Sequence, residues 1–236
     1  MEKGKGHDKS RKTMGLLCAS DTELEPFLTQ IPSPKITEKA MLTFYLGQIA
    51  RMNVVAVYSG VCKVNAAIAA QLLIDLFHVD GIINAGTAGG MDETVQLFDT
   101  IVSERVAYHD VADDILTEFH PWLKENYFYA NPKLYSAAQR YSQQSAFPIL
   151  FGTMVTGEQF IEEEKREIIH QSFAPLCVDM ETGSIAHVCY VNQVPFLSVR
   201  TITDTAEHQG IEIFEQNCKR ASKRCAEIVI GILEQL

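Results

Sequence analysis

Residues 195–204 read PFLSVRTITD, an apolar run that ends in a threonine and an aspartate. Aromatic and β-branched residues of this kind are typical of a buried β-strand. Two other runs share the design, MGLLCA at 14–19 and PLCVDM at 175–180. An acidic residue ends or follows each run: Asp204, Glu23 and Glu181. Because ligands bind at the carboxyl ends of strands in open α/β sheets, we expect these carboxylates to converge on one small, polar, sugar-like molecule. The arrangement favours the active site of a hydrolase or a transferase.

Strand-like and helix-like segments alternate outward from these runs. Further strands are expected at 42–49, 53–59, 81–85, 100–107 and 149–155. Helical spacing of apolar residues predicts helices at 63–77, 133–145, 162–172, 182–192 and 213–236. Residues 108–131 are irregular and long enough to form a functional loop. The pattern predicts an α/β fold in which a mixed sheet has helices on both faces, as a single domain over 14–236 preceded by a disordered tail at 1–13.

Composition narrows the classes of function. The 236 residues include 20 basic and 30 acidic side chains, so the formal net charge is −10. Nucleic acids and anionic membranes both attract basic surfaces, so neither is an expected partner. A small neutral or zwitterionic substrate fits this charge better.

The cysteines and the longest apolar runs favour a reducing, aqueous compartment. None of the six cysteines forms a CxxC pair, and most lie in apolar runs, where a free thiol behaves as a small hydrophobic group. A disulfide framework is therefore not expected, which points to the cytoplasm. No apolar run approaches the roughly 18 residues that span a bilayer.

Each acidic residue has a structural and a chemical interpretation. Glu23 fits a general base that activates water, with Arg200 as its orienting partner, or simply the acidic first turn of a helix. Glu181 fits an acceptor for the two hydroxyls of a ribose, or a carboxylate stabilised by the helix dipole. Asp204 fits a general acid whose pKa is raised by burial, or a cap on a turn. From any one residue alone, both interpretations remain open.

Other motifs mainly exclude chemistries. The stretch 84–90, NAGTAGG, lacks the spacing of a dinucleotide-binding fingerprint and the Lys-Ser/Thr of a P-loop, so it is either a tight turn or a ligand cradle. No HExxH or comparable spacing predicts a metal site, and no GxSxG motif supports a serine hydrolase. His187, inside a predicted helix, is expected to be a core residue. Phe160 and Ile161 belong either to the core or to an apolar pocket for a flat ring.

In order along the chain, seven motifs together resemble the 5′-methylthioadenosine/S-adenosylhomocysteine nucleosidases of the nucleoside phosphorylase superfamily. They are GLLCASDTELEPF, SGVCKVNAAIAAQLL, IINAGTAGG, VSERVAYHDV, TGEQFI, VDMETGSIAHVC and VPFLSVRTITD. The resemblance covers residues 14–236. It implies a three-layer fold with a central mixed, twisted sheet, a cytoplasmic homodimer, and no metal or organic cofactor. It also implies irreversible hydrolysis of the N-glycosidic bond of an adenine nucleoside in methionine salvage.

The resemblance assigns roles residue by residue. Asp204 resembles the acid that protonates adenine at N7, and Glu23 the base that activates water. Glu181 resembles the acceptor of the ribose hydroxyls, Met180 the residue that packs under the ribose, and Phe160 the aromatic ring that stacks on adenine. The remaining expected pocket residues are Ile161, Val61, Ala88, Gly89 and Thr203. Leu116 and Phe119 are expected to cover the thioalkyl group across a dimer interface.

Three departures from the family pattern bear on the substrate. Ser20 stands where the family commonly has Met, Thr203 where it has Ser, and Asp179 where it has Glu. Ser20 is the change expected to alter how the purine end is held.

Three rival functions remain open. A purine nucleoside or uridine phosphorylase would share the fold, but it needs a phosphate site, and the loop after the first strand offers Asp21 and Glu23 instead. A non-catalytic nucleoside-binding protein would not need both an acid and a base. A nucleosidase that prefers aminodeoxyfutalosine is the third alternative.

Overall fold

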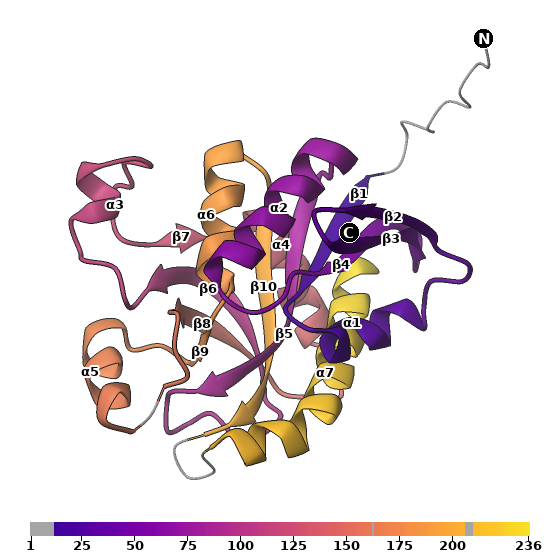
Figure 1. Ribbon diagram of the computed structural model, residues 1–236. Helices are drawn as coiled ribbons and strands as arrows, with labels where there is room; N and C mark the ends of the chain where they lie inside the picture. Colours follow the sequence, from indigo (N-terminus) through magenta and orange to yellow (C-terminus); the bar gives the residue numbers. More distant parts are fainter. Residues whose placement is uncertain (1–11, 162, 206–209) are drawn as a thin grey trace.

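A ten-stranded mixed sheet organises the protein in the computed structural model, which describes residues 12–161, 163–205 and 210–236 (Figure 1). The strands are β1 (Thr13–Cys18), β2 (Lys35–Lys39), β3 (Leu42–Ile49), β4 (Met52–Tyr58), β5 (Gly81–Gly90), β6 (Thr100–Tyr108), β7 (Phe128–Tyr129), β8 (Ile149–Thr156), β9 (Cys177–Asp179) and β10 (Phe196–Asp204). The helices are α1 (Asp21–Leu28), α2 (Lys63–Phe77), α3 (Ile115–Glu118), α4 (Pro132–Ser142), α5 (Glu163–Phe173), α6 (Thr182–Asn192) and α7 (Ile211–Leu233).

Part of the sheet closes on itself. The strands follow the order β10-β6-β8-β9-β5-β1-β4-β3-β2, with β7 on β6, and β10 also pairs with β5. Five strands, β5, β10, β6, β8 and β9, therefore form a ring from which β1, β4, β3 and β2 extend. Strands β1, β5 and β10 run parallel, so their carboxyl ends open at one edge of the sheet.

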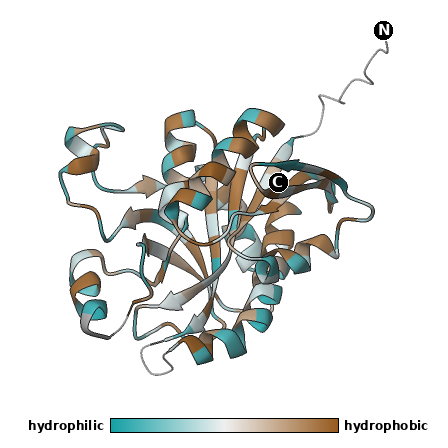
Figure 2. Cartoon of the chain, in the orientation of Figure 1, coloured by the Kyte–Doolittle hydropathy of each residue, from teal (hydrophilic) through white to brown (hydrophobic). Residues whose placement is uncertain are grey.

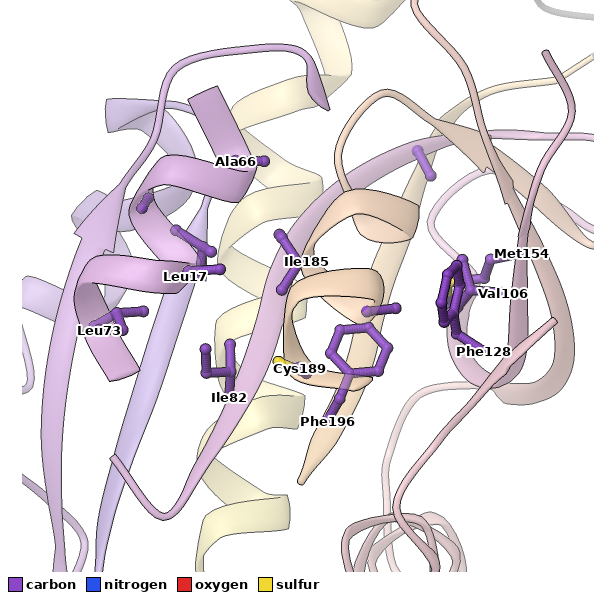
Figure 3. Packing of buried hydrophobic residues seen from close by; sticks show 14 of the residues in the cluster. Leu17, Ala66, Leu73, Ile82, Val106, Phe128, Met154, Ile185, Cys189 and Phe196 are labelled. Atoms are coloured by element: carbon purple, nitrogen blue, oxygen red, sulfur yellow. The ribbon is translucent and has the colours of Figure 1, made fainter. Parts of the chain in front are cut away.

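Helices cover both faces, which confirms the expected three-layer architecture. Helices α2 and α6 pack on one face through Ala66, Leu73 and Ile185 (Figure 3). Helices α1, α4 and α7 pack on the other face. In β1 the side chains alternate between the two cores, because successive residues of a strand point to opposite faces; Leu16 packs with one core and Leu17 with the other. Figure 2 shows that the helices carry hydrophilic residues on one side and hydrophobic residues on the other.

The elements differ from the expected ones in three places. The glycine-containing stretch 84–90 is neither a turn nor a loop, because it continues β5 to Gly90 and pairs with β9 and β10. Residues 108–131, expected to be irregular, include α3 and β7. Strand β2, whose sequence KITEK is mostly exposed, was not expected because it carries no apolar run.

The observed elements at the two ends of the chain begin close to where they were expected. Of the expected disordered tail at 1–13, residues 1–11 lie outside the described residues, and Thr13 begins β1. At the other end, α7 begins at Ile211, two residues earlier than expected. In the described part of the chain, no helix is long and apolar enough to cross a membrane.

Candidate active site

A cavity of about 380 Å³ lies at the carboxyl ends of β1, β5 and β10. Its walls come from segments that are far apart in the sequence but adjacent in the sheet. The expected pocket residues all line it: Glu23, Val61, Ala88, Gly89, Phe160, Ile161, Met180, Glu181, Thr203 and Asp204. Ser20 lines it as well. Arg200 does not reach the cavity, because it is fully buried beneath it.

Glu23 is fixed by the turn that joins β1 to α1. Its Oε2 accepts hydrogen bonds from the backbone N–H groups of Ala19 (2.8 Å) and Ser20 (3.2 Å). Its Oε1 accepts from the N–H of Thr87 (2.7 Å) and from the Thr87 hydroxyl (2.9 Å). Ser20 caps α1 and forms a capping box with Glu23, so the carboxylate is part of the helix start and also faces the cavity.

Arg200 holds three carboxylates together under the cavity floor. Its Nη2 lies 2.7 Å from Asp179 and 3.4 Å from Glu181, and its Nη1 lies 3.8 Å from Glu23. Nη2 also donates to Asn84 Oδ1 at 2.9 Å. Burial alone lowers the pKa of a guanidinium, but the three acids outweigh that effect and raise the pKa of Arg200. Arg200 lies near Glu23, where an orienting partner was expected, but its closest acidic partner is Asp179.

Glu181 lies at the junction of β9 and α6, and only 4% of its surface is exposed. Its Oε1 accepts a hydrogen bond from the backbone N–H of Cys62 at 2.9 Å. Burial raises the pKa of Glu181 to about 7, against the opposing effect of Arg200, and the charge of Asp179 adds to the rise. The carboxyl group therefore titrates close to neutral pH.

Asp204 ends β10 and is equally buried, at 4% exposure. Burial raises the pKa of Asp204, while the Thr203 hydroxyl, which donates to Oδ1 at 2.8 Å, and the charge of Arg166 lower it. Gly89, its partner in β5, leaves room for the carboxyl group, since a Cβ there would lie 3.0 Å from Oδ2. A buried carboxylic acid that keeps its proton is suited to general acid catalysis.

Strand β5 sets the separation between Glu23 and Asp204. A Cβ on Gly86 would collide with the Glu23 carboxylate and with Arg200, and Gly89 flanks Asp204. Glu23 therefore lies beside Gly86, and Asp204 lies beside Gly89 further along the same strand.

Apolar side chains form the walls between the carboxyl groups. Phe160 and Val61 are about half exposed at the cavity mouth, and Ile161 is buried deeper. Sequence reasoning missed Ile211 and Phe214 of α7, which also line the cavity. Their only signal was a position in the first turn of the last helix.

Sequence reasoning also missed two polar residues, Thr87 and Asp179, as functional partners. Thr87 donates twice to Glu23, and Asp179 forms the shortest ion pair of Arg200. The motifs NAGTAGG and VDMETG indicated that these stretches could belong to the site, but they did not show which residues Thr87 and Asp179 contact. Leu116 and Phe119 lie between β6 and β7, outside the lining of this cavity. Within the described residues, no group of three or more His, Cys, Asp or Glu side chains is placed to hold a metal ion.

Comparisons with known proteins agree with this geometry. The family model of the phosphorylase superfamily matches residues 13–234. A 5′-methylthioadenosine/S-adenosylhomocysteine nucleosidase from Pseudoalteromonas translucida is 34% identical over 232 residues, which covers 94% of this chain and 97% of the relative. This chain belongs to that family of nucleosidases within the phosphorylase superfamily.

Solved structures of nucleosidases in this family superpose closely on the fold. The Colwellia psychrerythraea nucleosidase in complex with adenine has a TM-score of 0.88 and 32% identity over 96% of each chain. The Streptococcus pyogenes S-adenosylhomocysteine nucleosidase in complex with 5-methylthiotubericidin has a TM-score of 0.89 and 25% identity, covering 98% of this chain and 99% of that one. The expected nucleoside phosphorylase-like fold is confirmed.

Proposed function

We propose that the protein hydrolyses the N-glycosidic bond of 5′-methylthioadenosine and S-adenosylhomocysteine and releases adenine. One observation carries the proposal. Two buried carboxyl groups, Glu23 and Asp204, line the same cavity, and they differ in their hydrogen-bond partners. The relatives that share the fold and sequence are nucleosidases of this specificity.

The leaving group sits at the Asp204 end. Adenine is a poor leaving group unless it is protonated, and Asp204 supplies the proton to N7. Burial raises the pKa of Asp204, which favours its protonated form. Phe160 stacks on the purine ring and Ile161 contacts its edge, while Ala88, Gly89 and Thr203 line the same end.

The sugar sits between the carboxyl groups. Glu181 accepts hydrogen bonds from the ribose hydroxyls, and Met180 packs beneath the ring beside Val61. Cleavage passes through an oxocarbenium-like state, so the anionic residues below the sugar stabilise the positive charge that develops on it. Arg200 keeps Glu23, Asp179 and Glu181 from repelling one another before the sugar arrives.

The water is activated at the Glu23 end. The four hydrogen bonds to Glu23 fill its lone-pair directions in the free protein. The Thr87 hydroxyl can rotate, however, so it releases one direction to the attacking water while the three backbone N–H groups keep the carboxylate in place. Glu23 then takes a proton from the water molecule, while the oxygen of that water forms its bond to the anomeric carbon.

The charge of the cavity favours water over phosphate. Its described lining includes five acidic residues, Glu23, Glu158, Asp179, Glu181 and Asp204. Arg166 is the one arginine or lysine in that lining, and Arg200 below the floor is committed to three carboxylates. A phosphorylase would place a doubly charged anion where these acids repel it.

Adenine release in phosphate-free buffer tests the proposal. We expect rapid release from methylthioadenosine together with free methylthioribose, and no acceleration by millimolar phosphate. Release that needs phosphate and yields a sugar 1-phosphate would establish a phosphorylase instead. Binding of the nucleoside without any release over hours would establish a binding protein.

We further propose a cytoplasmic homodimer that acts in methionine salvage. The six cysteines are free thiols, which suits a reducing compartment.

Exposed apolar side chains of α2, α6 and the segment before β7 form a candidate dimer face: Val64, Ile68, Tyr190, Phe119 and Trp122. Light scattering tests the dimer, and Ile68→Glu is expected to shift it toward the monomer. A protein that is monomeric at all concentrations would contradict this part of the proposal.

A further inference from the structure

The N-terminus of α2 contacts both halves of the cavity. The backbone N–H of Cys62 donates to Glu181 at 2.9 Å, and the next N–H, that of Lys63, donates to Oε1 of Glu158 at 3.1 Å. Glu181 belongs to the sugar half, whereas Glu158 lies two residues before Phe160 of the base half. One helix end therefore holds a carboxylate from each half, where the helix dipole favours negative charge.

The ammonium group of Lys63 strengthens only the contact to the base half. Its Nζ lies 2.9 Å from both carboxylate oxygens of Asp110 and 4.0 Å from Glu158. Asp110 and Glu158 are also joined to each other, because the backbone N–H of Glu158 donates to Asp110 Oδ2 at 3.0 Å. Lys63 also lies over the ring of Tyr108, 5.1 Å from its centroid, and only 20% of its side chain is exposed.

The segment 157–161 has other anchors besides Glu158: the Gln159 side chain pairs with Lys165, and Ile161 is buried in a cluster with Ala107 and Val155. Gly157 donates through its N–H to the Asp179 carbonyl at 3.1 Å, and its lack of a side chain allows His109 to pack against it. Phe160 at the far end is half exposed. Glu158, two residues before Phe160, is the part of this segment that the Lys63 network holds, so that network contributes to the position of Phe160 over the cavity.

We propose that Lys63 is a positioning residue for the base half of the cavity. Through Asp110 and Glu158 it fixes the segment 157–161, and so places Phe160 and Ile161 against the purine. It does not line the cavity and does not contact Glu181 through its side chain, so the sugar half is independent of it. The inference rests on the proposed function, because it assigns the purine to the Phe160 end.

The experiment compares Lys63→Met with the wild type. Methionine keeps the length of the side chain and removes its charge. We expect KM for methylthioadenosine and the inhibition constant of adenine to rise together, by about fivefold, since the ion pair is partly exposed. The inhibition constant of methylthioribose and kcat stay within about twofold. Lys63→Arg restores most of the loss, and Lys133→Met, an exposed lysine on α4, changes none of these constants.

Salt provides a second readout. Molar salt screens the attraction of Lys63 for Asp110 and Glu158 in the wild type and the repulsion between the two acids in Lys63→Met, so the difference in adenine affinity between the two proteins narrows. A merely structural role would not give this narrowing.

Three outcomes overturn the inference. Unchanged adenine inhibition in Lys63→Met would show that the network does not place the base half. An equal rise for adenine and methylthioribose together with a lower melting temperature would show general loosening. If the wild type releases no adenine, calorimetric titration of adenine into both proteins decides: a weaker affinity in the variant supports the inference although the proposed function fails, and equal or absent binding overturns it.

Discussion

The two ends of the cavity bury a carboxyl group to the same extent and surround it differently. Glu23 and Asp204 are each 4% exposed. Glu23 accepts four hydrogen bonds and lies near Arg200, whereas the Thr203 hydroxyl is the donor recorded for Asp204 among the described residues. Donors aimed at a carboxylate stabilise its charged form, and burial without them favours the neutral form. Burial alone therefore does not distinguish the proposed base from the proposed acid, whereas their described hydrogen-bond partners do.

Removing the acid gives the largest expected effect. Asp204→Asn keeps the shape of the side chain but cannot donate a proton to adenine, so kcat should fall by about 10²–10⁴-fold. Adenine should still bind, because Phe160 and Ile161 remain. Steady-state kinetics together with adenine titration measure both. A near-normal kcat would rule out the assigned role of Asp204.

Removing the base should cost less. Glu23→Gln retains the size of the side chain and its bonds from backbone N–H groups to one oxygen, but it cannot take a proton from water. We expect kcat to fall by about 10²-fold, with KM changed little. Asp21→Asn, an exposed carboxylate in the same helical turn, is the matched control and should leave kcat unchanged. Equal losses in the two variants would indicate that the helix start, rather than the base, had been damaged.

Glu181 extends the comparison of Glu23 with Asp204, because its hydrogen-bond donors do not cancel the rise in pKa that burial causes. Its pKa is raised from 4.5 to about 7, so folding favours its protonated form. The stability from this group is fully present below pH 4.5 and is lost as the pH rises through 7. Glu181→Gln mimics the protonated form, so unfolding should cost about 2–3 kcal/mol more than in the wild type at pH 8 and about the same at pH 4.5.

Thermal melts across this pH range measure the effect. The variant should lose affinity for the nucleoside, because an amide accepts the ribose hydroxyls less well. Destabilisation at pH 8 would show instead that the buried charge is needed to neutralise Arg200.

Thr203 tests the acid end with a smaller change. Its hydroxyl lowers the pKa of Asp204, so Thr203→Val should raise that pKa further. Asp204 must be protonated to act, and activity is lost as the pH rises through its pKa. The alkaline limb of the kcat profile should therefore move to higher pH by about one unit, the effect of one hydrogen bond to a charged group. An alkaline limb that stays in place would mean that another group controls it.

Replacing Cys62 is expected to have the smallest effect, a change in stability that arises from the backbone conformation of this residue. It adopts φ 81° and ψ 162°, a conformation that is nearly restricted to glycine, and this geometry accompanies the N–H bond to Glu181. Cys62→Gly should relieve that strain and stabilise the protein by about 1 kcal/mol, or roughly 2–4 °C in melting temperature. KM should stay unchanged because the N–H is retained. A lower melting temperature would show that the thiol contributes more than the strain costs.

Local patterns in the sequence predicted most of the sheet, and together with the family resemblance they predicted about half of the residues that line the cavity. Apolar runs gave β1 and β10, and the acids at the ends of the runs marked the site before any partner was known. The same reasoning left a turn open for 84–90, because glycines there read as breaks in a strand; the stretch is a strand, and three of its residues line the cavity. In the structure, Gly86 and Gly89 leave room for other residues: the side chains of Glu23, Arg200 and Asp204 occupy the space that a Cβ would need beside β5. A glycine that makes room for a distant residue looks the same in the sequence as one that makes a turn.

The sequence by itself was enough to propose which residues do the chemistry, because strand ends, helix starts and the order of the family motifs are local features. Only the tertiary structure decided how those residues are partnered. Pairing of β5 with both β1 and β10 brings Thr87 to Glu23, and the β9–α6 junction brings Asp179 and Glu181 to Arg200. Those contacts join segments that are tens of residues apart, and no periodicity along the chain encodes them. The surroundings of each carboxyl group follow from these contacts, so the electrostatic environment of the proposed acid and base belongs to the fold.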